Sequence, residues 1–332
     1  MKQYAFEQQN AALWSRYETL TKDLNSNKSS LNALQRYELP ALYRRICQHY
    51  AIAQQRHYSL HLINQLHQQV LAGHQLLYEH KVSWLWRMLS FIWVGFPNQI
   101  RRHWKVFWLA TLLFYLPAFA FGIACYFDSE MIYQIMPDHS VADMEYMYDP
   151  GNDNVGRKAE RQADTDIMMF GYYIFNNISI GFRAYALGIL LGIGTIFNMI
   201  YNGLFVGGVA GHLSQLGFTQ TFWPFVSGHS AFELTAICIC GAAGLCLARA
   251  IVAPGRRRRI DALRIAGIDS IQMVIGAALM LVIAAFIEAF WSSSNLLPIP
   301  VKYTVGAFFW LIVLLYLWRA GRNLEDGASD GD

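Results

Sequence analysis

Long apolar runs separated by short polar stretches occupy the chain from residue 106 to about residue 320. A helix needs about 20 apolar residues to cross roughly 30 Å of hydrocarbon. We predict six transmembrane helices, over residues 106–127, 171–197, 198–216, 229–253, 267–290 and 303–318. The pattern therefore predicts an all-α, polytopic membrane protein whose membrane domain covers residues 106–320.

The first 80 residues follow a different pattern, because they are rich in Gln, His and charged side chains and have few apolar runs. Their apolar residues recur at helical spacing. We predict helices over residues 9–25, 31–54 and 56–80 that form a cytoplasmic helical domain, residues 1–80.

Residues 81–105 join these two parts. The stretch 82–96 is rich in Trp, Phe and Leu but too short to span a bilayer, and Lys and Arg flank it. This composition is typical of an amphipathic helix lying in the membrane interface, followed by a basic linker. We expect Pro97 to end the helix. The alternative is a buried helix of a soluble domain.

Basic clusters near the spans set the expected orientation. They read "RRHWK" before the first span, "RRRR" after the fourth and "RAGR" after the sixth. Six spans place all three on one side, the cytoplasm, together with both termini and an acidic tail at 321–332. The loop 128–170, with ten acidic and three basic residues, then lies outside.

Composition narrows the function classes. Apolar residues make up 55% of the chain and charged residues 15%, and a net charge of +3 gives no indication of nucleic-acid binding. The five cysteines show neither a disulfide pattern nor a Cys-x-x-Cys metal motif. No P-loop, dinucleotide fingerprint or nucleophile elbow occurs, so we predict no organic cofactor.

Glycines recur every four residues in the middle spans. Such spacing lets membrane helices approach closely. The candidate packing glycines are Gly188, Gly192, Gly203, Gly207, Gly211 and Gly241. We expect spans two to four to form a compact bundle, although the same faces could serve a homodimer.

Polar residues within the spans form a candidate functional cluster. Its members are Asn176, Asn177, Arg183, His229 and Glu233, all expected in the outer half of the bilayer. A charge in mid-bilayer costs about 3 kcal/mol. We therefore expect Arg183 and Glu233 to approach each other or to line a hydrated cavity. The structural alternatives are a buried ion pair and, for the two asparagines, hydrogen bonds between helices.

A metal site is a further hypothesis for this region. His229 and Glu233 are four residues apart, on one helix face, and His212 and Glu288 are expected at the same membrane side. Histidine and carboxylate ligands suit zinc. Against it, the sequence lacks a His-Glu-x-x-His motif, and His212 and Glu288 could simply be interfacial residues.

The segments "FNNISIGFRAYALGILLGIGT", "NGLFVGG" and "GHSAFELTAICICGAAGL" resemble the stage II sporulation protein M family of bacterial membrane proteins. We expect the resemblance to cover essentially the whole chain. The matching positions are Asn176, Asn177, Arg183, Asn202, Gly203, His229, Glu233 and Gly241. It implies an integral inner-membrane protein. The family's namesake works with peptidoglycan-degrading enzymes, and other members are often linked to AAA-type ATPase systems.

Three functions are open at this point. The first is a scaffold, in a homo-oligomer within the lipid bilayer, that recruits envelope or peptidoglycan-related partners. The second is a transporter or channel that uses the intramembrane polar cluster. The third is an intramembrane metalloenzyme with zinc or another ion.

Overall fold

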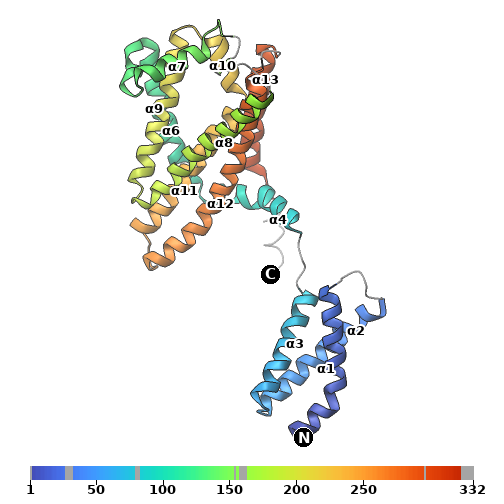
Figure 1. The fold of residues 1–332 in the computed structure, drawn as a ribbon. Coiled ribbons are helices and arrows are strands. Elements are labelled where there is room, and N and C mark those ends of the chain that lie inside the picture. The colour runs from blue at the N-terminus through green and yellow to red at the C-terminus, as the bar shows by residue number, and fades with distance from the viewer. Residues whose placement is uncertain are drawn as a thin grey trace. The chain divides into compact units, whose positions relative to one another are not determined.

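The computed structural model describes residues 2–26, 33–78, 83–152, 155–156, 163–294 and 297–322. The described residues are largely helical and include no β-strand. The chain divides into two compact units, residues 1–86 and 87–332 (Figure 1). The all-α prediction is therefore confirmed. Most of the acidic tail expected at 321–332 lies outside the described residues.

The first unit holds three helices, α1 (Gln3–Ser26), α2 (Ala33–Gln55) and α3 (Leu60–Tyr78). Its core is formed by fully buried side chains from all three helices, among them Tyr17, Ile46 and Leu66. α2 continues through an internal Pro40. The unit thus has a hydrophobic core of its own.

A helical run crosses the boundary into the second unit and consists of α4 (Trp84–Ser90), the π-helical turn η1 (Phe91–Gly95) and α5 (Phe96–Arg102). The expectation that Pro97 ends this helix is wrong, because Pro97 lies in the first turn of α5. There its missing N–H costs nothing and its fixed φ suits a helix. Phe96 is buried against Gly276 and Tyr316.

Six helices of more than 20 residues follow within the described residues. They are α6 (Trp104–Phe127), α8 (Ala163–Ala186), α9 (Ile193–Gln215), α11 (Ser230–Val252), α12 (Arg259–Phe286) and α13 (Ile299–Arg319). A π-helical turn, η4 (Ile287–Ser292), extends α12. Among the described residues, five helices are long and apolar enough to cross a membrane, and α8 is not one of them.

The boundary between α8 and α9 differs from the predicted one. The sequence pattern predicted a span to residue 197, but α8 ends at Ala186 and the short 3-10 turn η3 (Leu187–Ile189) follows. The chain reverses at Gly192, whose φ of +85° favours glycine. As a result, Arg183 lies in the last turn of α8.

α11 lies at the centre of the second unit and is buried over most of its length. It packs against α6, α8, α12 and α13. α6 and α9 form a tight pair, in which Gly203, Gly207 and Gly211 face backbone carbonyls of α6. The α9 glycine stripe therefore packs on the first long helix, α6, whereas the sequence pattern suggested packing among spans two to four.

Short helices cover one end of the second unit. They are η2 (Ser129–Gln134), α7 (Asp138–Tyr148) and α10 (Thr219–Ser227). Asp128 caps η2 by accepting from the Glu130 amide at 3.0 Å. Buried Ile132, Val141 and Leu213 join these helices to the end of α9.

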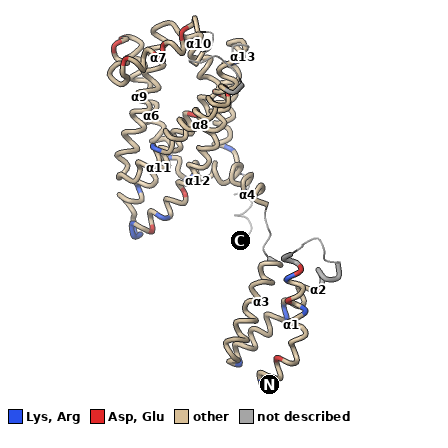
Figure 2. Tube along the Cα trace, viewed as in Figure 1, with Lys and Arg blue, Asp and Glu red and all other residues tan. Residues whose placement is uncertain are grey.

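Basic residues gather at the opposite end. Arg102 lies 3.6 Å from Asp269 near the start of α12, and Arg101 donates to the carbonyl of Leu317 at the end of α13. Figure 2 shows basic residues at the turn between α11 and α12, and acidic residues around α7. The ends of the helices therefore differ in charge.

Candidate functional site

Three ligand-type side chains meet where α11 begins. His229, Glu233 and Glu288 each present one ligand atom, and these atoms lie within 4.8 Å of one another. The Nε2 atom of His229 is 3.7 Å from Oε2 of Glu233. His229 is buried, whereas Glu233 and Glu288 are partly buried. We call this group the carboxylate–histidine cluster.

Local helix geometry brings these residues together. His229 occupies the N-cap position of α11 and Glu233 lies in its first turn, where a negative charge is favoured by the helix dipole. Glu288 lies in the π-helical turn η4. A π turn adds one residue per turn and changes the direction of later side chains, and such turns occur often at functional sites.

The His229 ring is held on two sides. Its Nδ1 atom lies 3.1 Å from Oγ of Ser292, and the Phe225 ring packs edge-on against it at 5.5 Å. Buried Lys302 donates to the Ser292 carbonyl at 2.8 Å and so joins η4 to α13. With Nδ1 engaged by Ser292, Nε2 is the ring nitrogen that faces the carboxylates.

Tyr148, at the end of α7, reaches the cluster from the covering helices. Its ring packs against Phe222 and Phe225. Burial raises the pKa of Tyr148 well above its usual 10, and the charges of Glu288 and Glu233 act in the same direction. The phenol is therefore within electrostatic reach of both carboxylates. No sequence signal pointed to Tyr148, because it lies in a loop far from Glu233 along the chain.

The two asparagines of α8 lie close to each other. Asn176 donates to Oδ1 of Asn177 at 3.1 Å. Asn177 is only 2% exposed, and its Nδ2 has no hydrogen-bond partner among the described residues. It lies one turn before Gly181, which faces α11 and α12, so Asn177 shares that interior face.

The expected approach of Arg183 to Glu233 is not found in the described residues. Arg183 is exposed, and its Nε donates to the Ser179 carbonyl of its own helix at 3.2 Å. Nearby Gly181 and Gly188 face Cys240 and Gly244. Arg183 is therefore at least seven residues from Glu233 along α11, about 10 Å at 1.5 Å per residue. The early end of α8 explains this separation.

His212 also lies away from the cluster. It is 2% exposed, and its Nε2 lies 2.7 Å from Oε1 of Glu145 on α7. Its expected place beside His229 as a metal ligand is therefore not found. This pair instead connects the end of α9 to the covering helix α7.

The other candidate glycines lie at close contacts. A Cβ atom on Gly188 would lie 2.1 Å from the Gly244 carbonyl oxygen, and one on Gly241 would lie 2.5 Å from Met199 Sδ. Gly192 approaches Ala248 in the turn before α9. At Gly188 a larger side chain would require the helices to separate, because the obstructing atoms belong to the backbone. At Gly241 the Met199 side chain would have to move.

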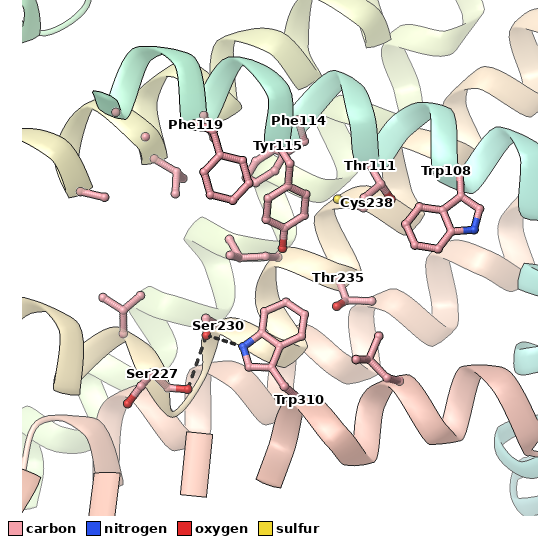
Figure 3. A pocket seen from close by; sticks show the side chains of 18 of the residues that line it. Trp108, Thr111, Phe114, Tyr115, Phe119, Ser227, Ser230, Thr235, Cys238 and Trp310 are labelled. Carbon is pink, nitrogen blue, oxygen red and sulfur yellow. Dashed lines mark hydrogen bonds between the residues drawn. The ribbon is translucent and has the colours of Figure 1, made fainter. Parts of the chain in front are cut away.

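A separate cleft opens on the other side of α11. It has a volume of about 1360 Å³ and lies between the α6–α9 pair and α13. Figure 3 shows Trp108, Tyr115, Phe119 and Trp310 along its walls. Ser230 and Thr235 of α11 also line it, whereas the carboxylate–histidine cluster contributes no residue. The second unit therefore has two separate candidate sites.

Comparison with known families assigns the two parts of the chain separately. Residues 110–293 match the family model for stage II sporulation protein M. Residues 4–79 match a different model, described as a domain of unknown function (DUF8413). The resemblance therefore covers less of the chain than its sequence motifs suggested. No curated protein and no solved structure gave a match. The match spans more than half of the chain and covers α8, α9, α11, α12 and most of α6. The chain therefore belongs to the stage II sporulation protein M family, whose members are membrane proteins.

Proposed function

We propose that the second unit binds a divalent cation, Zn²⁺ by its ligand chemistry, between His229, Glu233 and Glu288. The supporting observation is the convergence of one imidazole and two carboxylates within 4.8 Å. Imidazole nitrogen and carboxylate oxygen are both common zinc ligands. A cation would also offset the cost of holding two carboxylates side by side.

The distances are close to those of a metal site. Two ligands of one Zn²⁺ can be about 4.2 Å apart at most, since each bond is about 2.1 Å long. The 3.7 Å between His229 Nε2 and Glu233 Oε2 falls within this limit. The remaining ligand-atom separations are within 4.8 Å, so side-chain shifts of at most about half an ångström would bring them within the limit.

The surrounding groups fit a metal centre. Ligating histidines usually engage their second nitrogen in a hydrogen bond that fixes the ring, as Ser292 does for His229 here. Three protein ligands leave one position for water or substrate, the arrangement of catalytic zinc sites. The Tyr148 phenol is held protonated by its surroundings and is within electrostatic reach of both carboxylates.

Transport is less well supported than binding. Immediately deeper than Glu233, α11 contributes Ile237, Cys238 and Ile239 to the buried hydrophobic core, which also includes Met273 and Leu281 of α12. An ion path across the bundle needs polar groups along its length. These five described residues offer no charged or strongly polar group.

Metal analysis tests the proposal directly. The full-length protein is purified in detergent, exposed to Zn²⁺ and washed with a weak chelator. We expect one zinc per chain in the wild type and a loss of at least about tenfold in affinity for Glu233→Gln and His229→Ala. The proposal would be overturned if the wild-type protein retained no zinc. The three side chains would then be interpreted as a hydrogen-bonded cluster.

Glu145→Gln provides the matched control. Glu145 is a partly buried carboxylate beside a histidine, like Glu233, but its partner is His212. Glutamine keeps an oxygen that can accept from His212, so α7 should stay in place and this variant should bind zinc as the wild type does. Equal losses in Glu145→Gln and Glu233→Gln would show that zinc binds acidic surface groups nonspecifically, which contradicts a defined site.

The number of spans determines on which side of the membrane the carboxylate–histidine cluster lies. We propose that α8 is a sixth span, because it is 24 residues long and packs against both α11 and α12 despite its lower hydropathy. Six spans place both termini and the basic ends in the cytoplasm of a bacterium, with the carboxylate–histidine cluster near the outer face of the inner membrane. Asp143→Cys and Arg257→Cys test this topology. A thiol reagent that does not cross the membrane should label these two positions from opposite sides.

A scaffold role is the second candidate, supported by the separate N-terminal unit. This unit has its own core and its own family match, so it can present a docking surface independently of the membrane helices. We propose that it recruits envelope-related partners, with an AAA-type ATPase system as one candidate, and that the protein forms a homo-oligomer. Deletion of residues 1–80 should abolish co-purification of partners without removing zinc.

A further inference from the structure

A basic pocket lies at the charged end of the second unit. It has a volume of about 520 Å³ and is lined by Asn98, Gln99, Arg101, Arg102 and Arg322. Three of these five side chains are guanidinium groups, which bind phosphate oxygens through paired N–H donors. The pocket is therefore suited to an anion.

The basic pocket adjoins the apolar cleft described above. Arg101 and Arg322 line both of them. Next to these arginines, Trp104, Trp108 and Trp318 line the same end of the cleft. Arg322 lies over the Trp318 ring at 5.4 Å. Tryptophan beside basic residues is typical of the headgroup level of a membrane.

Farther from the arginines, the cleft wall is apolar. Several of its hydroxyl groups are engaged by the protein: Thr111 donates to the Phe107 carbonyl, and Ser227 donates to the Pro224 carbonyl. Ser230 donates to the Ser227 carbonyl and accepts from Trp310 (Figure 3). The wall therefore suits a hydrocarbon chain better than a polar ligand.

We propose that this composite site binds an anionic glycerophospholipid from the surrounding membrane. Its phosphate would contact Arg322, Arg102 and those N–H groups of Arg101 that do not donate to the Leu317 and Ala320 carbonyls. Its acyl chains would lie in the cleft along α6. The positive charge of the pocket and the apolar surface beside it match the two parts of such a lipid. The site lies on the opposite side of α11 from the zinc cluster, so the two proposals stand independently.

A transmembrane helix from another protein fits the cleft less well. Helices associate in membranes through faces of small residues. The glycines that border the cleft, Gly122, Gly207 and Gly211, are already engaged in the close contact between α6 and α9. Instead, the large side chains of Trp108, Tyr115 and Phe119 extend from α6 into the cleft (Figure 3). Flexible acyl chains can follow such an uneven surface, whereas a rigid helix cannot approach it closely.

Native mass spectrometry of the full-length protein tests the proposal. The protein is released from detergent with equal amounts of phosphatidylglycerol and phosphatidylcholine. We expect bound phosphatidylglycerol to predominate in the wild type, and each of Arg322→Gln and Arg102→Gln to reduce its binding about fivefold. The matched control is Arg257→Gln, an exposed arginine at the same end outside the pocket, which should keep the preference.

Photo-crosslinking locates the bound lipid. Because it uses the wild-type protein, it tests the proposal even if the arginine variants fail to fold. Wild-type protein is labelled with phosphatidylglycerol carrying a diazirine on one acyl chain. We expect labels on Trp108, Tyr115 and Phe119, which line the cleft, and few on exposed Ile271 and Ile275 of α12. Labels spread evenly over both groups, an equal affinity for both lipids, or equal losses in Arg257→Gln and Arg322→Gln would overturn the proposal.

Discussion

His212 and Glu145 join the end of α9 to α7 through a contact of 2.7 Å between Nε2 and Oε1. The histidine is almost completely buried and the glutamate is partly buried. This contact is a polar link between the covering helix α7 and the long helix α9. Together with the apolar core around Val141 and Leu213, it holds α7, with Tyr148 at its end, over the second unit.

We therefore predict that His212→Ala loosens α7. Removing one partner of a buried polar pair lowers stability by about 1–3 kcal/mol. This loss should mainly reduce the free energy needed for α7 to open locally. Hydrogen exchange of peptides covering residues 138–148 should become faster, with little change in α12. His139→Ala, at an exposed histidine of the same helix, should leave exchange unchanged. Equal exchange in both variants would show that the contact does not hold α7.

A second prediction concerns the orientation of His229. Ser292→Ala removes the Oγ atom that lies 3.1 Å from His229 Nδ1, but it keeps the backbone carbonyl that accepts from Lys302. Zinc affinity should fall about 10- to 100-fold, as for other residues that orient metal ligands. Competition with a zinc-binding dye measures the affinity.

Ser293→Ala is the control for this experiment. The Ser293 hydroxyl donates to the Ala289 carbonyl of its own turn at 2.8 Å, so its loss should not change the position of the His229 ring. Similar affinities in the two serine variants would argue against the role assigned to Ser292.

A third prediction uses the close contact between α6 and α9. A Cβ atom on Gly207 would lie 2.0 Å from the carbonyl oxygen of Ala118, so Gly207→Ala must separate the helices. We expect a loss of about 1–3 kcal/mol, as for other overpacked sites. Retention of the monodisperse protein after heating in detergent measures the change.

Gly171→Ala should have the opposite effect. No atom lies within 4 Å of a Cβ placed at this exposed position of α8. Alanine favours a helix over glycine by about 0.5–1 kcal/mol, so this variant should be as stable as the wild type or slightly more stable. A fall in stability equal to that of Gly207→Ala would contradict the packing explanation.

A fourth prediction concerns pH and the first unit. Trp14 donates through Nε1 to Nδ1 of His49 at 3.0 Å, which requires neutral histidine. Burial, with a contribution from Arg45, lowers the pKa of His49 below 6.5. Between the lowered pKa and 6.5 the unfolded chain binds more protons than the folded chain. The free energy of unfolding should therefore be constant above about pH 6.5 and decrease as the pH falls below it.

Hydrogen exchange of α1 and α2 at pH 7.5 and 5.5, corrected for the intrinsic rate, measures this change in the full-length protein. His49→Gln keeps an acceptor for Trp14 but cannot titrate, so the pH dependence should be smaller in this variant. An unchanged pH dependence would assign the effect to other groups.

Much of this architecture could be predicted from local sequence. The lengths of the apolar runs predicted the ends of α6, α11 and α13 to within a few residues, because the bilayer sets the length of an apolar helix. The start of α12 at Arg259 was missed, since its first two turns carry charges that a hydropathy pattern excludes. The end of α8 was missed as well, because "ALGILLGIG" remains apolar while the backbone turns at Gly192.

Residue spacing was enough to predict that His229 and Glu233 share one helix face, since four residues complete about one helical turn. The other groups that join them could be identified only from the packing of the helices. The π-helical turn at 287–292 directs Glu288 and Ser292 toward His229, whereas the early end of α8 separates Arg183 from them. Helical periodicity fixes the face of each residue along its own helix. The depth and rotation of one helix against another depend on packing between distant segments, which local sequence does not specify.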